Sequence, residues 1–195
     1  MIDYYNRCGY AVYCIDHQGH GKSEGVKPRT SHGHVGYVRS FDDVARDMWD
    51  VVNNVVMVDY PDTPVILHGH CMGGAHVLRA LQLLPRAERP SNLAGVILSA
   101  PSYLVPPEAK PSRFIMAALG CLACCAPKVT VADWPDRNDS SLDVRFYNDP
   151  FCAPRPFSAH YANELNKMCT FPIPCAACAG ASAGGFCRVA TDINP

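Results

Sequence analysis

The sequence has no apolar run long enough to cross a bilayer. Its longest such stretch, from Phe114 to Ala126, falls well short of the roughly 20 residues that a membrane-spanning helix needs. Runs of like charge are also missing, and the net charge is only −1, so there is no basic surface for nucleic acid and no polybasic membrane anchor. We therefore expect small-molecule ligands and no nucleic-acid partner.

The sequence also lacks the features of a secreted, disulfide-bonded protein. The N-terminal residues have no basic block followed by an apolar block, so we expect no signal peptide and a cytoplasmic, reducing location. The 11 cysteines are odd in number and irregularly scattered, which predicts free thiols rather than a disulfide framework. With 195 residues, one domain is the expectation.

Two motifs that suggest a bound cofactor fail on their spacing. The run GHGKS resembles the end of a phosphate-binding loop, but Asp16 stands where the first glycine of that motif should be. Six histidines and two CxxC pairs could be zinc ligands, but the spacing of these residues matches no regular zinc motif. We expect no metal and no cofactor. The residues concerned are histidines 17, 20, 32, 34, 68 and 70 and the pairs Cys121/Cys124 and Cys175/Cys178.

Short apolar runs alternate with helical patterns over the first hundred residues, which predicts an α/β fold with a doubly wound, mostly parallel sheet. The continuous apolar strands are typical of a sheet buried on both faces. Ligands of such sheets bind at the carboxyl ends of strands, where Asp16, Cys71 and Ser99 fall. The expected strands are Tyr10–Ile15, Val65–Leu67 and Leu93–Ser99, and the expected helices are Ile2–Arg7, Phe41–Val58 with Ser40 as N-cap, and about Ala75–Leu84.

The rhythm changes after the third strand. Scattered prolines and the apolar patch Phe114 to Ala126 predict a helical lid insertion over residues 103–161, between a core at 1–102 and a return to the core at 162–195. A buried helix of the main core is the alternative for the apolar patch. From Phe171 onward the sequence begins like a strand but turns into Ala, Gly and Cys, which have little β propensity.

The segment Gly69-His70-Cys71-Met72-Gly73 matches the nucleophile elbow G-x-S-x-G with cysteine in place of serine. A strand that turns sharply into a helix strains the central residue, and the flanking glycines avoid a clash with it. Cys71 would stand at a helix N-terminus, where the dipole favours a thiolate and the Met72 amide is placed to bind an oxyanion. A buried structural thiol is the alternative for Cys71.

Four sequence blocks resemble the monoacylglycerol lipases of the α/β-hydrolase superfamily. They are GYAVYCIDHQGHGKSEG, SFDDVARDM, PVILHGHCMGGA and LAGVILSAP, and the later block YNDPFC favours the monoglyceride lipase branch over lysophospholipases and serine aminopeptidases. The resemblance implies a partial α/β-hydrolase fold with a lid, and hydrolysis of monoglycerides to fatty acid and glycerol without a cofactor. It places Cys71 at the nucleophile position and makes the Met72 amide an oxyanion donor.

The resemblance also implies how the substrate is held. The expected pocket includes His70, Phe114, Met116 and Leu119. The apolar patch that contains the last three would touch lipid aggregates, giving peripheral contact with a membrane.

Three parts of the family's catalytic machinery have no counterpart here. The second oxyanion donor belongs to a His-Gly loop upstream of the matching blocks, the acid is missing after Gly180, and no histidine follows His160. Loss of a triad member costs on the order of 10⁴ to 10⁶ in rate, although a cysteine needs the base less than a serine does. Two hypotheses stay open: a slow cysteine-dependent hydrolase, or a catalytically inactive lipid-binding fragment or pseudoenzyme. A truncated translation with a shifted reading frame over about Cys175 to Ala190 is our hypothesis for the losses.

Overall fold

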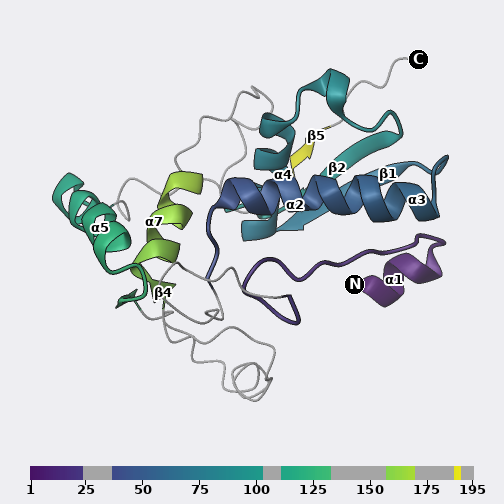
Figure 1. The fold of residues 1–195 in the computed structure, drawn as a ribbon. Helices are drawn as coiled ribbons and strands as arrows, with labels where there is room; N and C mark the ends of the chain where they lie inside the picture. Colours follow the sequence, from purple (N-terminus) through teal and green to yellow (C-terminus); the bar gives the residue numbers. More distant parts are fainter. Residues whose placement is uncertain (24–36, 103–110, 133–156, 170–186, 190–195) are drawn as a thin grey trace.

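The computed structural model describes residues 1–23, 37–102, 111–132, 157–169 and 187–189 (Figure 1). Its main sheet has the strand order β1-β2-β5, in which β1 and β2 are parallel and β5 is antiparallel to β2. Strands β3 and β4 form a separate antiparallel pair. The strands are β1 (Val65–His70), β2 (Leu93–Ser99), β3 (Thr130–Ala132), β4 (Phe157–Ser158) and β5 (Cys187–Val189). The helices are α1 (Ile2–Arg7), α2 (Phe41–Val51), the π-helix η1 (Val52–Val56), α3 (Met57–Asp59), α4 (Met72–Leu83), the 3-10 helix η2 (Arg86–Glu88), α5 (Arg113–Cys125) and α7 (Ala159–Met168).

Helices α2 and α4 pack together with β1 and β2 to form the main core (Figure 1). Trp49 on α2 is buried, and its indole N–H donates to the Ala80 carbonyl of α4 at 2.8 Å. Arg79 on α4 makes two hydrogen bonds to the Asp42 carboxylate of α2, at 2.6 and 2.9 Å. The two helices are therefore fixed to each other by apolar packing on one side and by ionic hydrogen bonds on the other.

The expected helix over Phe41–Val58 is confirmed, and the Ser40 side chain caps it by accepting from the Asp42 N–H at 3.1 Å. Its apolar face differs after Val52, because η1 is a π-helical segment. A π-turn adds a residue to one turn and rotates every later side chain. Regular helical spacing would place Val55 on the same face as Met48 and Val52, but Val55 is 42% exposed and Val56 packs against the core instead.

The strand predicted at Tyr10–Ile15 is wrong. This segment has no strand partner, and Tyr10 and Tyr13 are 54% and 39% exposed. A strand exists only where a neighbour takes up its backbone hydrogen bonds, and a cavity of about 680 Å³ separates this segment from β1. Both elements line that cavity.

The expectation that the strands are buried on both faces is also wrong. Along β1 the burial alternates, with Val65 and Leu67 buried and Ile66 43% exposed. Ile97 on β2 is 37% exposed. Because α2 and α4 cover one face, the residues that alternate with the core positions remain accessible, as in a sheet packed on a single side.

The apolar patch of the expected lid forms α5, which begins after the N-cap Ser112 and packs against α7. Figure 1 shows α7 between α5 and the layer of α2 and α4. The alternative of a buried core helix is wrong, because Phe114 and Ile115 are 90% and 59% exposed. Among the described helices, none has the length and apolarity that crossing a bilayer requires.

The anomalous C-terminal segment falls largely outside the described residues. Only β5 is described within the stretch from Cys175 to Ala190, and it pairs with β2 in the antiparallel sense, with Val189 opposite Val96. The block YNDPFC and most of the expected lid also lie outside the described residues. The expected division of the chain at residues 102 and 161 stays a prediction.

Candidate active site

Cys71 is the single residue between the end of β1 and the start of α4. Its backbone has φ +51° and ψ −119°, a combination that residues other than glycine rarely adopt. The sharp strand-to-helix turn predicted from the sequence is therefore confirmed. The strained backbone conformation is therefore at Cys71 itself, the residue at the centre of the turn.

The crowding around the turn identifies which glycines it requires. A Cβ at Gly69 would collide with the backbone carbonyl of Gly73, and a Cβ at Gly74 would lie 2.6 Å from Cβ of Pro101. At Gly73 itself a Cβ would meet nothing within 4 Å. Gly69 is therefore required, but its close approach is to the backbone of Gly73 and Gly74 rather than to Cys71. The prediction is wrong for Gly73, because the other close approach involves Gly74, the second residue of the glycine pair.

The elbow is tied by three contacts to the last residue of β2 and to the segment that follows it. The Cys71 N–H donates to the Ser99 carbonyl at 2.9 Å, and the Ser102 N–H donates to the Cys71 carbonyl at 2.9 Å. The Cys71 sulfur lies 3.1 Å from the Ser102 hydroxyl oxygen. The carboxyl ends of the two parallel strands thus meet at Cys71, as predicted for this class of sheet.

The thiol of Cys71 is free and exposed, so the alternative of a buried structural cysteine is wrong. Met72 is the first residue of α4, and its N–H is one of the donors that a helix leaves without an intrahelical acceptor. These donors and the helix dipole favour negative charge beside Cys71. The turn therefore combines an accessible sulfur with a donor for an anionic oxygen.

Tyr161 connects the elbow to α7. Its hydroxyl donates to Sδ of Met72 at 3.3 Å, and its ring packs on Phe41 with the centroids 5.7 Å apart. Burial raises the pKa of Tyr161 to about 12, so the phenol stays protonated at neutral pH. Sequence reasoning missed both Tyr161 and Ser102, although Ser102 directly follows the block LAGVILSAP.

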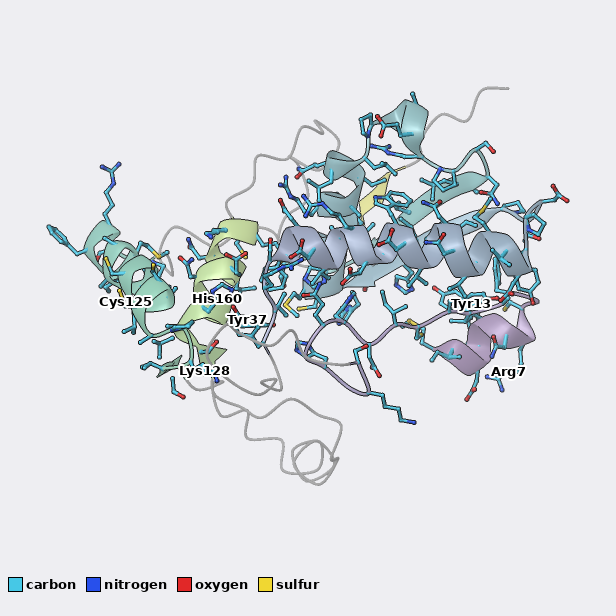
Figure 2. All side chains as sticks on the ribbon, viewed as in Figure 1. Arg7, Tyr13, Tyr37, Cys125, Lys128 and His160 are labelled. Carbon is cyan, nitrogen blue, oxygen red and sulfur yellow. The ribbon has the colours of Figure 1, made fainter. Side chains whose placement is uncertain are left out.

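The structure shows no histidine in hydrogen-bond contact with the Cys71 sulfur among the described residues. His70 precedes Cys71, and its Nδ1 lies 3.2 Å from the Ser99 hydroxyl oxygen. His160, the last histidine of the sequence, stacks on Tyr37 at 4.8 Å and places Nε2 2.9 Å from the Arg39 carbonyl (Figure 2). Neither ring supplies a base to the thiol in this conformation.

The half-buried His17 and the buried His76 lie with their ring centroids 5.1 Å apart. Burial lowers the pKa of both, and that of His76 falls to about 3. Neither ring nitrogen of His76 has a hydrogen-bond partner among the described residues. The pair is therefore uncharged at neutral pH and packs as part of the interior.

Asp16, the third residue expected at a strand end, organises its own loop. Its carboxylate accepts from the Lys22 N–H at 2.9 Å, and its carbonyl accepts from the Ser23 hydroxyl at 2.6 Å. A Cβ at Gly21, which has φ +56°, would collide with that carboxylate. Gly21 is therefore required by the tight turn that Asp16 organises.

Of the four expected pocket residues, only His70 adjoins Cys71. Phe114, Met116 and Leu119 lie on α5, which packs on α7, and α7 in turn contacts the elbow through Tyr161. None of the four lines the cavity of about 680 Å³ between β1 and the N-terminal segment. Their role in a pocket stays a prediction.

The described residues contain no group of three or more His, Cys, Asp or Glu arranged to hold a metal ion. Cys121 and Cys124 of the first CxxC pair are free and exposed on α5, near Cys125, which Figure 2 labels. The second pair and histidines 32 and 34 lie outside the described residues.

The comparisons with known proteins agree on one superfamily. The family model described as serine aminopeptidase, S33 matches residues 1–173. The chain is 38% identical to monoglyceride lipase of Rattus norvegicus over 148 residues, which cover 74% of this chain and 44% of the relative. It is 39% identical to monoglyceride lipase of Homo sapiens over 109 residues, which cover 55% of this chain and 31% of the relative. The chain thus spans less than half the length of these relatives.

Two solved structures show the same fold. A monoacylglycerol lipase of Paleococcus ferrophilus aligns with a TM-score of 0.60 at 23% identity and covers 86% of this chain and 58% of that one. A carboxyl esterase of Bacillus coagulans in complex with glycerol aligns with a TM-score of 0.59 at 21% identity and covers 87% and 57%. The parallel strands and their helices form part of an α/β-hydrolase fold.

Proposed function

Because this chain belongs to the monoglyceride lipase family of α/β hydrolases, we propose that its elbow acts on the ester bond of a monoglyceride through Cys71. The observation that carries the proposal is the strained, exposed position of Cys71 between β1 and α4. Such a turn holds a nucleophile clear of its own backbone and at the positive end of a helix.

The proposed reaction has two steps. The Cys71 sulfur attacks the ester carbonyl carbon, and the Met72 N–H stabilises the oxygen that becomes negative. The C–O bond to glycerol then breaks, glycerol leaves with a proton, and a thioester remains on Cys71. Water hydrolyses the thioester, which releases the fatty acid and restores the thiol.

The second step is expected to limit turnover. A thiol acylates with less help from a base than a serine needs, but hydrolysis of the thioester requires an activated water. No described histidine contacts the sulfur, and loss of the base costs on the order of 10⁴ to 10⁶ in rate in triad enzymes. The acyl-enzyme should therefore accumulate.

A burst experiment tests this proposal. The full chain is mixed with a chromogenic short-chain ester, and we expect a burst of about one product molecule per chain followed by slow turnover. Mass spectrometry should locate the acyl group on Cys71. Cys121→Ala, which removes an exposed thiol on α5, should keep the burst, and Cys71→Ala should lose it. Equal acylation of Cys71 and Cys121 would contradict the proposal.

The runner-up is a catalytically inactive lipid-binding fragment or pseudoenzyme of the same fold. The observation that favours it is that Ser102 is the only described side chain in hydrogen-bond contact with the Cys71 sulfur. A thiol-acylating probe separates the two functions. If the native chain labels at Cys71 faster than a denatured sample, the hydrolase is supported, and equal labelling favours the lipid-binding fragment.

We also propose that α5 belongs to a lid insertion on a doubly wound sheet, and that α5 makes peripheral contact with lipid. The outer stripe of α5 is exposed and uncharged, while the more buried residues of the helix are Met116, Leu119, Gly120, Leu122 and Ala123. Arg113 is the only charged residue within the helix. Phe114→Ser should weaken binding to phosphatidylcholine vesicles, whereas Thr130→Ser, at an exposed position outside α5, should not.

A further inference from the structure

A second thiol lies against the serine that contacts Cys71. Cys169 is the C-cap residue of α7, it is half-buried, and its S–H donates to the Ser102 carbonyl at 3.8 Å. The hydroxyl oxygen of the same Ser102 lies 3.1 Å from the Cys71 sulfur. Two cysteines that are far apart in the sequence thus converge on one residue at the mouth of the elbow.

We propose that Cys71 and Cys169 form a peroxide-reactive pair, in which a hydroperoxide oxidises Cys71 and Cys169 converts the product into a Cys71–Cys169 disulfide. This reaction does not require ester hydrolysis. It assigns to the chain a modification site whose substrate class is hydrogen peroxide or an organic hydroperoxide. Formation of this disulfide blocks the Cys71 sulfur, which the proposed hydrolase uses as its nucleophile.

The chemistry balances in two steps. The Cys71 thiolate attacks the terminal peroxide oxygen, the O–O bond breaks, and the alcohol or water leaves with a proton, so that Cys71 becomes a sulfenic acid. The Cys169 thiol then attacks the Cys71 sulfur and gives up its proton, the S–O bond breaks, and the hydroxyl group leaves with that proton as water. Two thiols are oxidised by two electrons, and one peroxide is reduced.

The environments of the two sulfurs favour this order. Cys71 is exposed at the N-terminal end of α4, where unpaired amides favour an anion. Cys169 is half-buried, and burial raises its pKa, so it stays a protonated thiol that reacts poorly with peroxide in solution. Once a sulfenic acid forms on Cys71, the neighbouring Cys169 thiol can attack its sulfur and form the disulfide.

The contacts with Ser102 set the geometric requirement. A disulfide needs a sulfur–sulfur distance of about 2.05 Å, so the Ser102 hydroxyl must leave the Cys71 sulfur before the bond closes. Rotation of the Ser102 side chain achieves this without breaking the hydrogen bond from its N–H to the Cys71 carbonyl. The end of α7 supplies the other sulfur directly after the last helical residue, Met168.

The test is a disulfide map of the full chain. The reduced protein is treated with one equivalent of hydrogen peroxide, remaining thiols are blocked with N-ethylmaleimide, and linked peptides are identified by mass spectrometry. We expect the Cys71–Cys169 link as the main product and its loss after dithiothreitol. In Cys169→Ser, dimedone should trap the sulfenic acid on Cys71. Cys121→Ser, a matched change at an exposed thiol, should leave the link in place.

Three outcomes would overturn the proposal. One is a disulfide between Cys71 and a cysteine other than Cys169, such as Cys175, which follows Cys169 in the sequence. Another is the same set of links in a sample unfolded in urea, and the third is oxidation of Cys121 while Cys71 remains a thiol. If the link forms but the ester burst is absent, the proposed hydrolase falls and the peroxide-reactive pair stands.

Discussion

Tyr161 on α7 donates its hydroxyl hydrogen to Sδ of Met72, the first residue of α4, at 3.3 Å. This hydrogen bond joins the helix that carries Cys169 to the helix that begins beside Cys71. The Tyr161 ring is buried in a small cluster with Val38, Phe41, Val44, Ala75 and Met168. Tyr161 therefore links the elbow to α7 through both its hydroxyl group and its buried ring.

Substitution of Tyr161 should separate its two contributions. Tyr161→Phe removes the hydroxyl contact and should lower the free energy of unfolding by about 0.5–1.5 kcal/mol. Tyr161→Ala also removes the ring from the cluster and should cost about 3–5 kcal/mol, the usual range for a buried aromatic side chain. Urea denaturation followed by fluorescence measures both. If the two variants lose the same stability, the ring does not pack as described.

The two adjacent glycines of the elbow provide a matched pair. Gly74→Ala places a Cβ 2.6 Å from Pro101, so the start of α4 must move away from the end of β2. Such overpacking typically costs about 1–3 kcal/mol. Gly73→Ala meets no atom within 4 Å and should be neutral or stabilising by up to about 1 kcal/mol, because alanine favours a helix.

Thermal unfolding of the two glycine variants measures the difference directly. We expect a lower Tm for Gly74→Ala and an unchanged or higher Tm for Gly73→Ala. Labelling of Cys71 by iodoacetamide should change only in Gly74→Ala. The reverse order of stabilities would show that the close approach occurs at the first glycine.

The sequence predicted those features that depend on local pattern. The strand Leu93–Ser99 and the cap at Ser40 are confirmed because apolar runs and capping side chains act within a few residues. The strand at Tyr10–Ile15 failed because a strand also needs a neighbour, and no local pattern reports the cavity beside it. The requirement for Gly74 and the role of Tyr161 depend on contacts with Pro101 and Met72 across the fold.

The pair formed by His76, which is buried, and His17, which is half-buried, predicts a loss of stability in mild acid. In the unfolded chain a histidine titrates at about 6.5, whereas burial lowers the pKa of His76 to about 3 and also lowers that of His17. Below pH 6.5 the unfolded state therefore binds more protons than the folded state. The contribution of His76 is fully present above pH 6.5 and is lost toward pH 3, by about 1.4 kcal/mol per pH unit.

Replacement of His76 tests that assignment. His76→Leu removes a titrating group whose two ring nitrogens have no hydrogen-bond partner among the described residues. Urea denaturation at pH 7.5 and 5.5 should show a smaller pH dependence than in the unchanged chain, and stability at pH 5.5 should rise. His70→Leu, at an exposed histidine, is the control against which the change in His76→Leu is compared. If the free energy of unfolding of His76→Leu changes with pH as much as that of the unchanged chain, His76 is not the source of the acid sensitivity.

The strain at Cys71 gives a prediction in which stability and reactivity move in opposite directions. The residue has φ +51°, and a side chain in such a region costs on the order of 1–3 kcal/mol. Cys71→Gly relieves the strain because glycine has no Cβ, although it adds backbone entropy to the unfolded chain. We expect a net gain in the free energy of unfolding, with complete loss of acylation at position 71. Cys71→Ala keeps the Cβ and removes the same sulfur, so it should lose acylation without the gain. If Cys71→Ala is as stable as Cys71→Gly, the elbow is not strained, and the position would resemble an ordinary turn rather than one that holds a nucleophile outward.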